Sequence, residues 1–232
     1  NFPLGITSAG ALLIYLEQTQ HKELTNICSI SRIDEGAFVW MDRFTFRNLE
    51  IFTSTAGKEG TSLVEVMDKC SSPMGARMLR TWLAMPVMDL KELEDRYSVV
   101  QHFVDNQDDL LRLQTMIGEI GDLERIISRA AAGKIMPREV MQLRRGLSQT
   151  DPIMKLCSGK GVQALDDMMA NMGDCAELLD YLGKTMHPET ASQLGKGDVI
   201  AGGVNEELEE RRRIARHGKD DLLEVQQREI ER

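Results

Sequence analysis

The residues with the clearest chemical potential form a short charged group, Gly121 to Arg125. Asp122 and Glu124 place two carboxylates beside the guanidinium of Arg125, with apolar residues around them. Such a polar cluster could form a site. The same pattern is typical of a helix start, with Asp122 as the cap and Glu124 near the positive end of the helix dipole. We interpret the group as a helix start and keep the polar site as the alternative.

Glycine followed by lysine occurs repeatedly, which raises the question of a phosphate-binding loop. That loop requires the pattern G-x-x-x-x-G-K-[ST], whose backbone N–H groups cradle phosphates. Only Gly183-Lys184 is followed by a hydroxyl residue, Thr185, and Leu178 stands where its first glycine should be. The sequence therefore predicts no nucleotide hydrolysis by this chain.

Metal and nucleophilic chemistry find no better support in the sequence. The histidines never form H-E-x-x-H, and His187-Pro-Glu189 lacks the P-C-x-x-C partner of a zinc deaminase. The cysteines never form C-x-x-C, and no serine lies in G-x-S-x-G. We therefore expect no catalytic residue, no metal ligand and no bound cofactor. The residues considered are His21, His102, His187, His217, Cys28, Cys70, Cys157 and Cys175.

The net charge of −9 argues against indiscriminate binding to nucleic acid. One basic concentration remains, formed by Lys134, Arg138, Arg144 and Arg145, which only partly share a helix face. We interpret it as a solvated face, with a phosphate contact as the alternative. No aromatic residues interleave with it to stack bases, so single-strand binding is not indicated.

Nothing in the sequence indicates secretion or a membrane. There is no signal peptide, and the apolar run at 11–16 is too short to span a bilayer. Scattered cysteines without a signal peptide are typical of reduced thiols in a cytosolic protein. We expect a cytoplasmic protein without membrane contact. The 14 methionines indicate a Met-rich core, with a Met-lined groove as the alternative.

The first 43 residues combine a helix with a β-like segment. Apolar residues on one face predict a helix over 7–20. Alternation at 28–33, a turn at 34–36 and an apolar run at 37–41 predict a small β-hairpin.

Helical signals dominate from Thr45 onward. Arg47 to Glu50 is interpreted as a helix start, and Ser72-Pro73 caps a second helix that Pro86 ends. Asp89 caps a third, whose inward stripe is predicted to be Leu93, Tyr97, Val100 and Val104. Further helices are expected at 107–117, 122–132, 137–149, 162–172 and 175–182.

The last part of the chain changes character twice. Four glycines in 195–203 predict a tight turn and a short strand. From Asn205, glutamates followed by arginines form i,i+4 pairs on a long, polar helix. Such a helix bridges solvent or needs a partner helix. Because the chain begins at Asn1 and ends inside this charged run, we expect a fragment of a larger protein.

Four blocks of sequence resemble the core, or lever, domain of the MutS DNA mismatch repair family, in the same order and at similar spacing. The resemblance covers nearly the whole chain, and the block from Pro73 to Leu83 is its most specific part. The blocks comprise Arg47, Asn48, Leu49 and Glu50; then Pro73, Met74, Gly75, Arg77, Leu79, Trp82 and Leu83, closed by Pro86; then Gly121, Asp122, Leu123, Glu124 and Arg125; and finally the run 205–208.

The resemblance implies a mainly α fold: a multi-helical core with a small β-hairpin near the N-terminus and a long polar C-terminal helix. Residues 1–43 are expected to be the end of a connector domain with a linking β segment. Residues 44–204 are expected to be the α-helical core, and 205–232 the start of a lever helix that leads to an absent clamp.

The resemblance also implies a function. The chain is expected to be a non-catalytic module that couples nucleotide state to DNA clamping. The parent protein is expected to be a bacterial, nucleoid-associated, homodimeric ATPase that uses ATP and Mg²⁺ and binds mismatched double-stranded DNA and a MutL-like protein. An independent α-helical interaction scaffold is the alternative.

Overall fold

The structure is a computed structural model that describes residues 3–19, 27, 29–31, 35–192 and 194–230. It is mainly helical, as the sequence predicts. The chain divides into two compact units, Asn1–Gly36 and Ala37–Arg232. No helix in the described ranges has both the length and the apolar character needed to cross a membrane.

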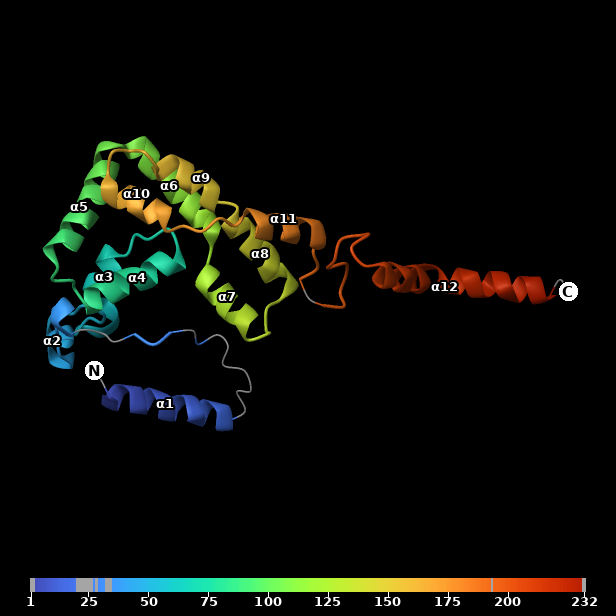
Figure 1. Ribbon diagram of the computed structural model, residues 1–232, viewed down its shortest axis with the longest axis horizontal. Helices are drawn as coiled ribbons and strands as arrows, with labels where there is room; N and C mark the ends of the chain where they lie inside the picture. Colours follow the sequence, from blue (N-terminus) through green and yellow to red (C-terminus); the bar gives the residue numbers. More distant parts are fainter. Residues whose placement is uncertain (1–2, 20–26, 28, 32–34, 193, 231–232) are drawn as a thin grey trace. The chain divides into compact units, whose positions relative to one another are not determined.

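The first unit contains helix α1, Pro3–Gln18 (Figure 1). It begins four residues before the predicted start, so Thr7 and Ser8 are not its caps. Their hydroxyls donate instead to the carbonyls of Pro3 and Leu4, both at 2.9 Å. No residue of α1 is buried.

No β-hairpin is seen among the residues described near the N-terminus, and this part of the fold prediction is wrong. The turn region forms a short 3-10 helix, η1, Glu35–Ala37. Phe38, in the predicted second arm, forms an antiparallel bridge with Val87. Cys28 and residues 32–34 lie outside the described residues. The apolar run in 37–41 pairs with the segment around Pro86, because the Pro86 carbonyl accepts from Val39 N–H at 2.8 Å.

The second unit holds the remaining helices. Most predicted helices are present with shifted ends, while α3 and α9 were not predicted. Their bounds are α2 Arg43–Asn48, η2 Gly57–Glu59, α3 Leu63–Met67, α4 Pro73–Ala84, α5 Leu90–Asp105, α6 Gln107–Ile120, α7 Leu123–Ala131, α8 Pro137–Leu147, α9 Thr150–Cys157, α10 Gln163–Ala170, α11 Ala176–Thr185 and α12 Glu206–Ile230.

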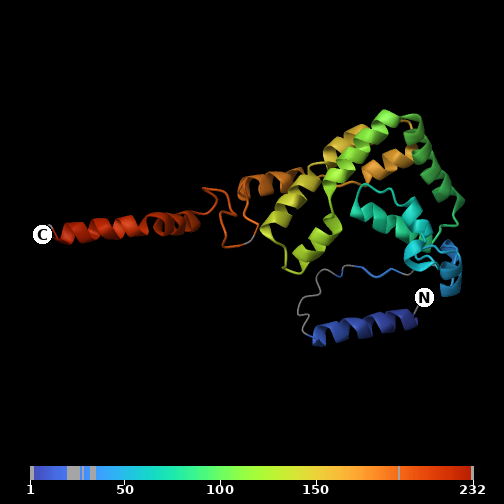
Figure 2. The same cartoon turned by 180° about the vertical axis from the view of Figure 1, so that it is seen from behind.

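Helices α5, α6, α9 and α10 pack together around the main apolar cluster, and Figures 1 and 2 show them side by side. Ile153, Cys157 and Leu165 form its buried centre. Two of these come from α9, which follows α8 after only two residues. The sequence has no clear helix breaker between α8 and α9, so the helix predicted from residue 137 extends to residue 149.

The inward face of α5 differs from the predicted one. Val99 and Phe103 pack against the Ile153 cluster. Tyr97, Val100 and Val104, which were predicted to face inward, are 67%, 59% and 56% exposed. Both faces of α5 carry apolar residues, so periodicity alone does not decide which one is covered.

Helix α8 packs against α6, α7 and α11. Its buried Gly146 permits the closest of these approaches, because a Cβ there would lie 2.4 Å from the carbonyl oxygen of Ile120. Arg129 of α7 donates to the carboxylate of Glu139 on α8 at 3.0 Å. A close backbone approach therefore joins α8 to α6, and an ion pair joins α8 to α7.

Candidate functional site

The start of α4 is built from the block that opens with Ser72 and Pro73. Ser72 is buried, and its hydroxyl accepts from Gly75 N–H at 3.1 Å. Pro73 occupies the first helical turn, where its missing N–H costs no hydrogen bond. A Cβ on Gly75 would lie 3.3 Å from the Ser72 hydroxyl, so glycine keeps room for the cap. These residues fix where α4 begins and hence where Arg77 lies.

The start of α7 is built from the block Gly121 to Arg125. Gly121 has a φ of 74° and a ψ of −149°, a conformation nearly restricted to glycine. This turn lets Asp122 cap α7, and its carboxylate accepts from Arg125 N–H at 3.3 Å. Ile126 on the next turn is buried. The structure thus supports the helix-start interpretation of this group.

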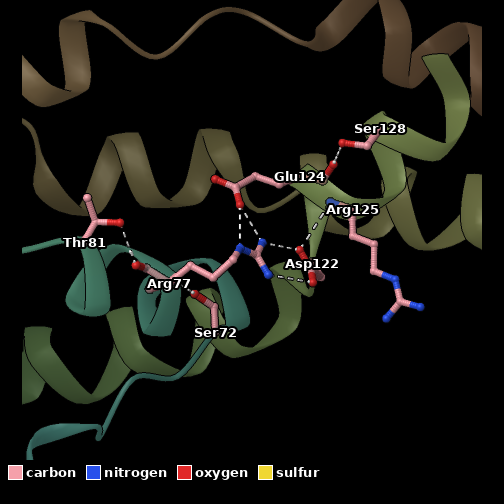
Figure 3. Close-up of polar contacts among 8 residues, drawn as sticks. Ser72, Arg77, Thr81, Asp122, Glu124, Arg125 and Ser128 are labelled. Atoms are coloured by element: carbon pink, nitrogen blue, oxygen red, sulfur yellow. Dashed lines mark hydrogen bonds and ion pairs between the residues drawn. The ribbon is translucent and has the colours of Figure 1, made fainter. Parts of the chain in front are cut away.

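Arg77 joins the two blocks, which are 45 residues apart in the sequence (Figure 3). Its Nη2 lies 2.6 Å from Asp122 Oδ1 and 2.5 Å from Glu124 Oε2. Its Nε donates to the same Glu124 oxygen at 2.8 Å, and its Nη1 donates to Asp122 Oδ2 at 3.1 Å. We call this arrangement of Arg77, Asp122 and Glu124 the arginine fork. A guanidinium that binds two carboxylates at once fixes both distance and angle.

The ion pairs of the fork shift the pKa values of Asp122 and Arg77. Hydrogen bonds from Arg77 lower the pKa of the Asp122 carboxyl. Desolvation raises this pKa, but by less. Hydrogen bonds to Asp122 and Glu124 raise the pKa of the Arg77 guanidinium further above its ordinary value. Asp122 and Arg77 are therefore both charged at neutral pH, and neither is suited to accept or donate a proton there. The arginine fork can position helices and does not resemble an acid–base pair.

The block Arg47 to Glu50 ends a helix, so its interpretation as a helix start is wrong. Asp42 caps the beginning of α2 by accepting from Thr45 N–H at 2.7 Å. Glu50 has a φ of 49°, and its N–H donates to the carbonyl of Arg47 at 3.1 Å. Ile51 N–H donates back to the carbonyl of Phe46 at 3.2 Å. These two bonds form a Schellman motif, in which glutamate occupies a position that usually holds glycine.

A side-chain contact supports the unusual backbone of Glu50. Its carboxylate accepts from the backbone N–H of Thr55 at 2.7 Å and also from the Thr55 hydroxyl. These bonds lower the pKa of Glu50. The following Ile51 is buried. Its carbonyl accepts a hydrogen bond from the backbone N–H of the fully buried Val64 at 3.0 Å. The block therefore directs the chain from α2 into the packed segment around α3.

The remaining residues of the Pro73–Pro86 block lie along α4 and just beyond it. Leu79, Leu83 and Pro86 are half-buried. Trp82 is 41% exposed, and the guanidinium of Arg96 on α5 lies 3.8 Å from the centre of its ring. This cation–π contact links α4 to α5. Met74, Met78 and Trp82 line a surface hollow beside Arg77 and Glu124.

The base of α12 forms a second cluster that the sequence analysis did not identify. Asn205 caps the helix by accepting from Leu208 N–H at 2.9 Å. Asp198 lies 3.2 Å from Arg212 Nε and 2.9 Å from Arg216 Nη2. Arg212 Nη2 also donates to the carbonyl of Ile200 at 2.8 Å. An acidic residue in a glycine-rich loop before an arginine-rich helix was the available signal.

This cluster connects α12 to α11 through the preceding loop. Ile200 forms an antiparallel bridge with Met186, which follows directly after α11. His187 N–H donates to the carbonyl of Val199 at 2.8 Å, and Ala201 N–H donates to that of Thr185 at 2.8 Å. The predicted short strand in 195–203 is thus a single bridge. We call Asp198, Ile200, Arg212 and Arg216 the α12 root.

The structure brings together some of the sequence-predicted residues and separates others. Arg77, Asp122 and Glu124 meet in the arginine fork, while the Arg47–Glu50 turn packs on α3. Of the basic group, Lys134 lies between α7 and α8, and the three arginines lie on α8. In the described part of the chain, no three histidine, cysteine, aspartate or glutamate side chains are placed to hold a metal ion.

Comparisons with known proteins match nearly the whole of this chain. A family model described as MutS domain III matches residues 44–231. A DNA mismatch repair protein MutS from Parabacteroides distasonis is 46% identical over 228 residues, which cover 98% of this chain and 26% of that protein. Proteins of the same description from Flavobacterium johnsoniae and Bacteroides thetaiotaomicron are 42% and 41% identical, also over 98% of this chain and 26% of each protein. The chain spans about a quarter of the length of these curated relatives.

Proposed function

Because the chain belongs to the MutS family and matches its domain III, we propose that it is the non-catalytic core and lever module of a mismatch-recognition ATPase. In this proposal the module couples the nucleotide state of the parent protein to its grip on DNA. ATP, Mg²⁺, mismatched double-stranded DNA, a MutL-like partner and a homodimeric, cytoplasmic parent belong to the same proposal.

The α12 root is the observation that carries the proposal. A lever transmits movement only if its base is fixed to the body that moves. Arg212, only 17% exposed at its side chain, contacts both Asp198 and the Ile200 carbonyl. Helix α12 has 25 residues, so it extends about 37 Å from that base. A rotation at the base is therefore carried over a domain-sized distance.

The arginine fork supports the other half of the proposal. It ties the N-terminal half of α4 to the start of α7 with four hydrogen bonds from one guanidinium. The Arg129–Glu139 pair continues the connection from α7 to α8, and α8 packs on α11, which leads to the α12 root. Such a chain of directional contacts favours a body that moves as one piece.

A chimera tests this proposal. The 232 residues replace the matching segment of the Parabacteroides distasonis protein, and Asp198→Asn is then introduced. We expect the variant to keep mismatch affinity without nucleotide and ATP turnover without DNA. We expect ATP-induced release from a mismatched duplex to slow by about fivefold or more, the lower range of measured site-to-site couplings.

The matched control is Lys184→Gln, which breaks the exposed Lys184–Asp180 pair on α11 and leaves the root intact. It should release DNA at the rate of the unsubstituted chimera. Unchanged release in Asp198→Asn, or ATP turnover by the 232-residue chain alone, contradicts the proposal. A stable dimer of the chain in sedimentation experiments, with α12 protected, favours the independent scaffold.

A further inference from the structure

Helix α8 presents three arginines without a partner. Among the described residues, no hydrogen bond or ion pair involves the guanidinium group of Arg138, Arg144 or Arg145, and all three residues are exposed. In contrast, Arg77, Arg129 and Arg212 all bind carboxylates. In a chain with a net charge of −9, three unpaired guanidinium groups on one short helix are a local excess of positive charge.

The arginines border two adjoining hollows. The larger, about 730 Å³, is lined by Arg138, Met141 and Arg145 of α8 and by Gly118 and Gly121 at the end of α6. The smaller, about 360 Å³, is lined by Met141, Arg144 and Arg145 together with Leu179 of α11. Met141 and Arg145 thus belong to both. The acidic residue in the larger hollow, Glu119, accepts a hydrogen bond from Gln149 at 2.9 Å.

The spacing of the arginines matches a helical ligand. Arg138 and Arg145 are seven residues apart, so they lie on the same face of α8 and about 10 Å apart along its axis. Two carboxylates seven residues apart on a partner helix have the same separation. Met141 lies between the arginines and offers an apolar contact for a side chain between those carboxylates. Arginine with an adjoining apolar contact is a frequent composition of protein interface centres.

We propose that this face of α8 is a docking surface for an acidic α-helical segment of a partner protein. Its carboxylates bind Arg138 and Arg145, and an apolar side chain between them contacts Met141. A DNA duplex is the less suitable ligand, because hollows of this size accept side chains and the net negative charge of the chain repels a polyanion. The inference does not depend on the proposed lever function.

A methyl-NMR titration tests the docking surface. The probe is a short, end-blocked alanine–glutamine helix with two glutamates seven residues apart and a leucine between them. The chain is labelled at its methionine methyl groups, and Met141→Leu assigns the Met141 signal. We expect a saturable shift of that signal. Arg138→Glu/Arg145→Glu should weaken binding by about tenfold or more, because it replaces attraction by repulsion.

Two controls separate specific docking from net charge. Lys155→Glu/Lys184→Glu changes the net charge equally at exposed sites that line neither hollow, and it should leave the affinity within about twofold. The peptide with both glutamates replaced by glutamine should not bind. Arg138→Gln/Arg145→Gln, which adds no repulsion, should also lose the Met141 shift.

The proposal is overturned if the peptide leaves the Met141 signal unmoved at millimolar concentration. It is also overturned if charge reversal on α8 and the lysine control weaken binding equally. A short DNA duplex that shifts Met141 in an arginine-dependent manner, while the peptide does not, would assign the surface to nucleic acid instead.

Discussion

Gly121 has an uncommon backbone conformation and lies between the end of α6 and the start of α7. Its φ of 74° and ψ of −149° let α6 end and Asp122 begin α7 directly afterwards. Asp122 then caps α7 and binds Arg77 of α4 with the same carboxylate. One residue without a Cβ thereby allows a single carboxylate to serve two helices.

Gly121→Ala tests this role. Alanine would be strained in this backbone conformation, and its Cβ would lie 3.0 Å from Gln142 Nε2. We expect the free energy of unfolding to fall by about 1–3 kcal/mol, measured by urea denaturation. Gly118→Ala, in the last turn of α6 and with its nearest neighbour at 3.9 Å, is the control and should not destabilise the fold. Equal effects of the two substitutions would contradict the conformational argument.

The arginine fork also predicts how the free energy of unfolding depends on pH in acid. Because its pKa is lowered in the folded state, Asp122 stabilises the fold above its unfolded pKa of about 3.9. This contribution is lost as the pH falls through the lower, folded pKa. We expect Arg77→Met to flatten the decline in unfolding free energy between about pH 5 and pH 2. Urea denaturation across this range measures the slope, and an unchanged slope would contradict the fork's contribution.

At the scale of the element, α5 shows how two apolar faces compete for the core. The face with Val99 and Phe103 covers Ile153, Cys157 and Leu165, while Tyr97 and Val100 lie in solvent. The sequence predicts that α5 is helical and that Asp89 caps it, and the structure confirms both. The choice of face depends on α9 and α10, and α9 could not be separated from α8 by sequence signals.

Phe103→Ala and Val100→Ala form a matched pair of substitutions on α5. Phe103 packs against the central cluster, so its truncation should cost about 2–4 kcal/mol of unfolding free energy. Val100 is 59% exposed, and its replacement should change stability by less than about 0.5 kcal/mol. Thermal and urea unfolding of both variants provide the measurement. The reverse order of effects would restore the face predicted from periodicity.

The sequence identified helix caps more reliably than helix ends or tertiary partners. Ser72 and Asp122 act as the predicted caps because a cap depends on residues within the same turn. The Arg47–Glu50 block was assigned the wrong end of its helix, because Glu50 adopts a conformation that usually indicates glycine. The arginine fork joins residues 45 positions apart, and no local pattern contains that information.

At the scale of the whole molecule, the described contacts of α12 with the preceding loop concentrate at the root. Arg212 and Arg216 reach Asp198 from its first three turns. Other ion pairs of the helix, such as Glu207–Arg211, are local and exposed, and exposed pairs contribute little. A helix held mainly at one end has its stability graded along its length, because an isolated helix is marginal in water.

Hydrogen exchange along α12 tests this gradient. We expect amides at 210–216 to be more protected than those at 222–230. Asp198→Asn removes the charge that Arg212 and Arg216 share, and it should speed exchange at 210–216 by about tenfold, as expected for a loss of roughly 1–2 kcal/mol. Asp180→Asn, which breaks the exposed Lys184 pair on α11, should leave exchange in α12 unchanged. Strong and uniform protection from 210 to 230 in a monomer would show that α12 is stabilised along its whole length, and would remove the root as the fixed end of the lever.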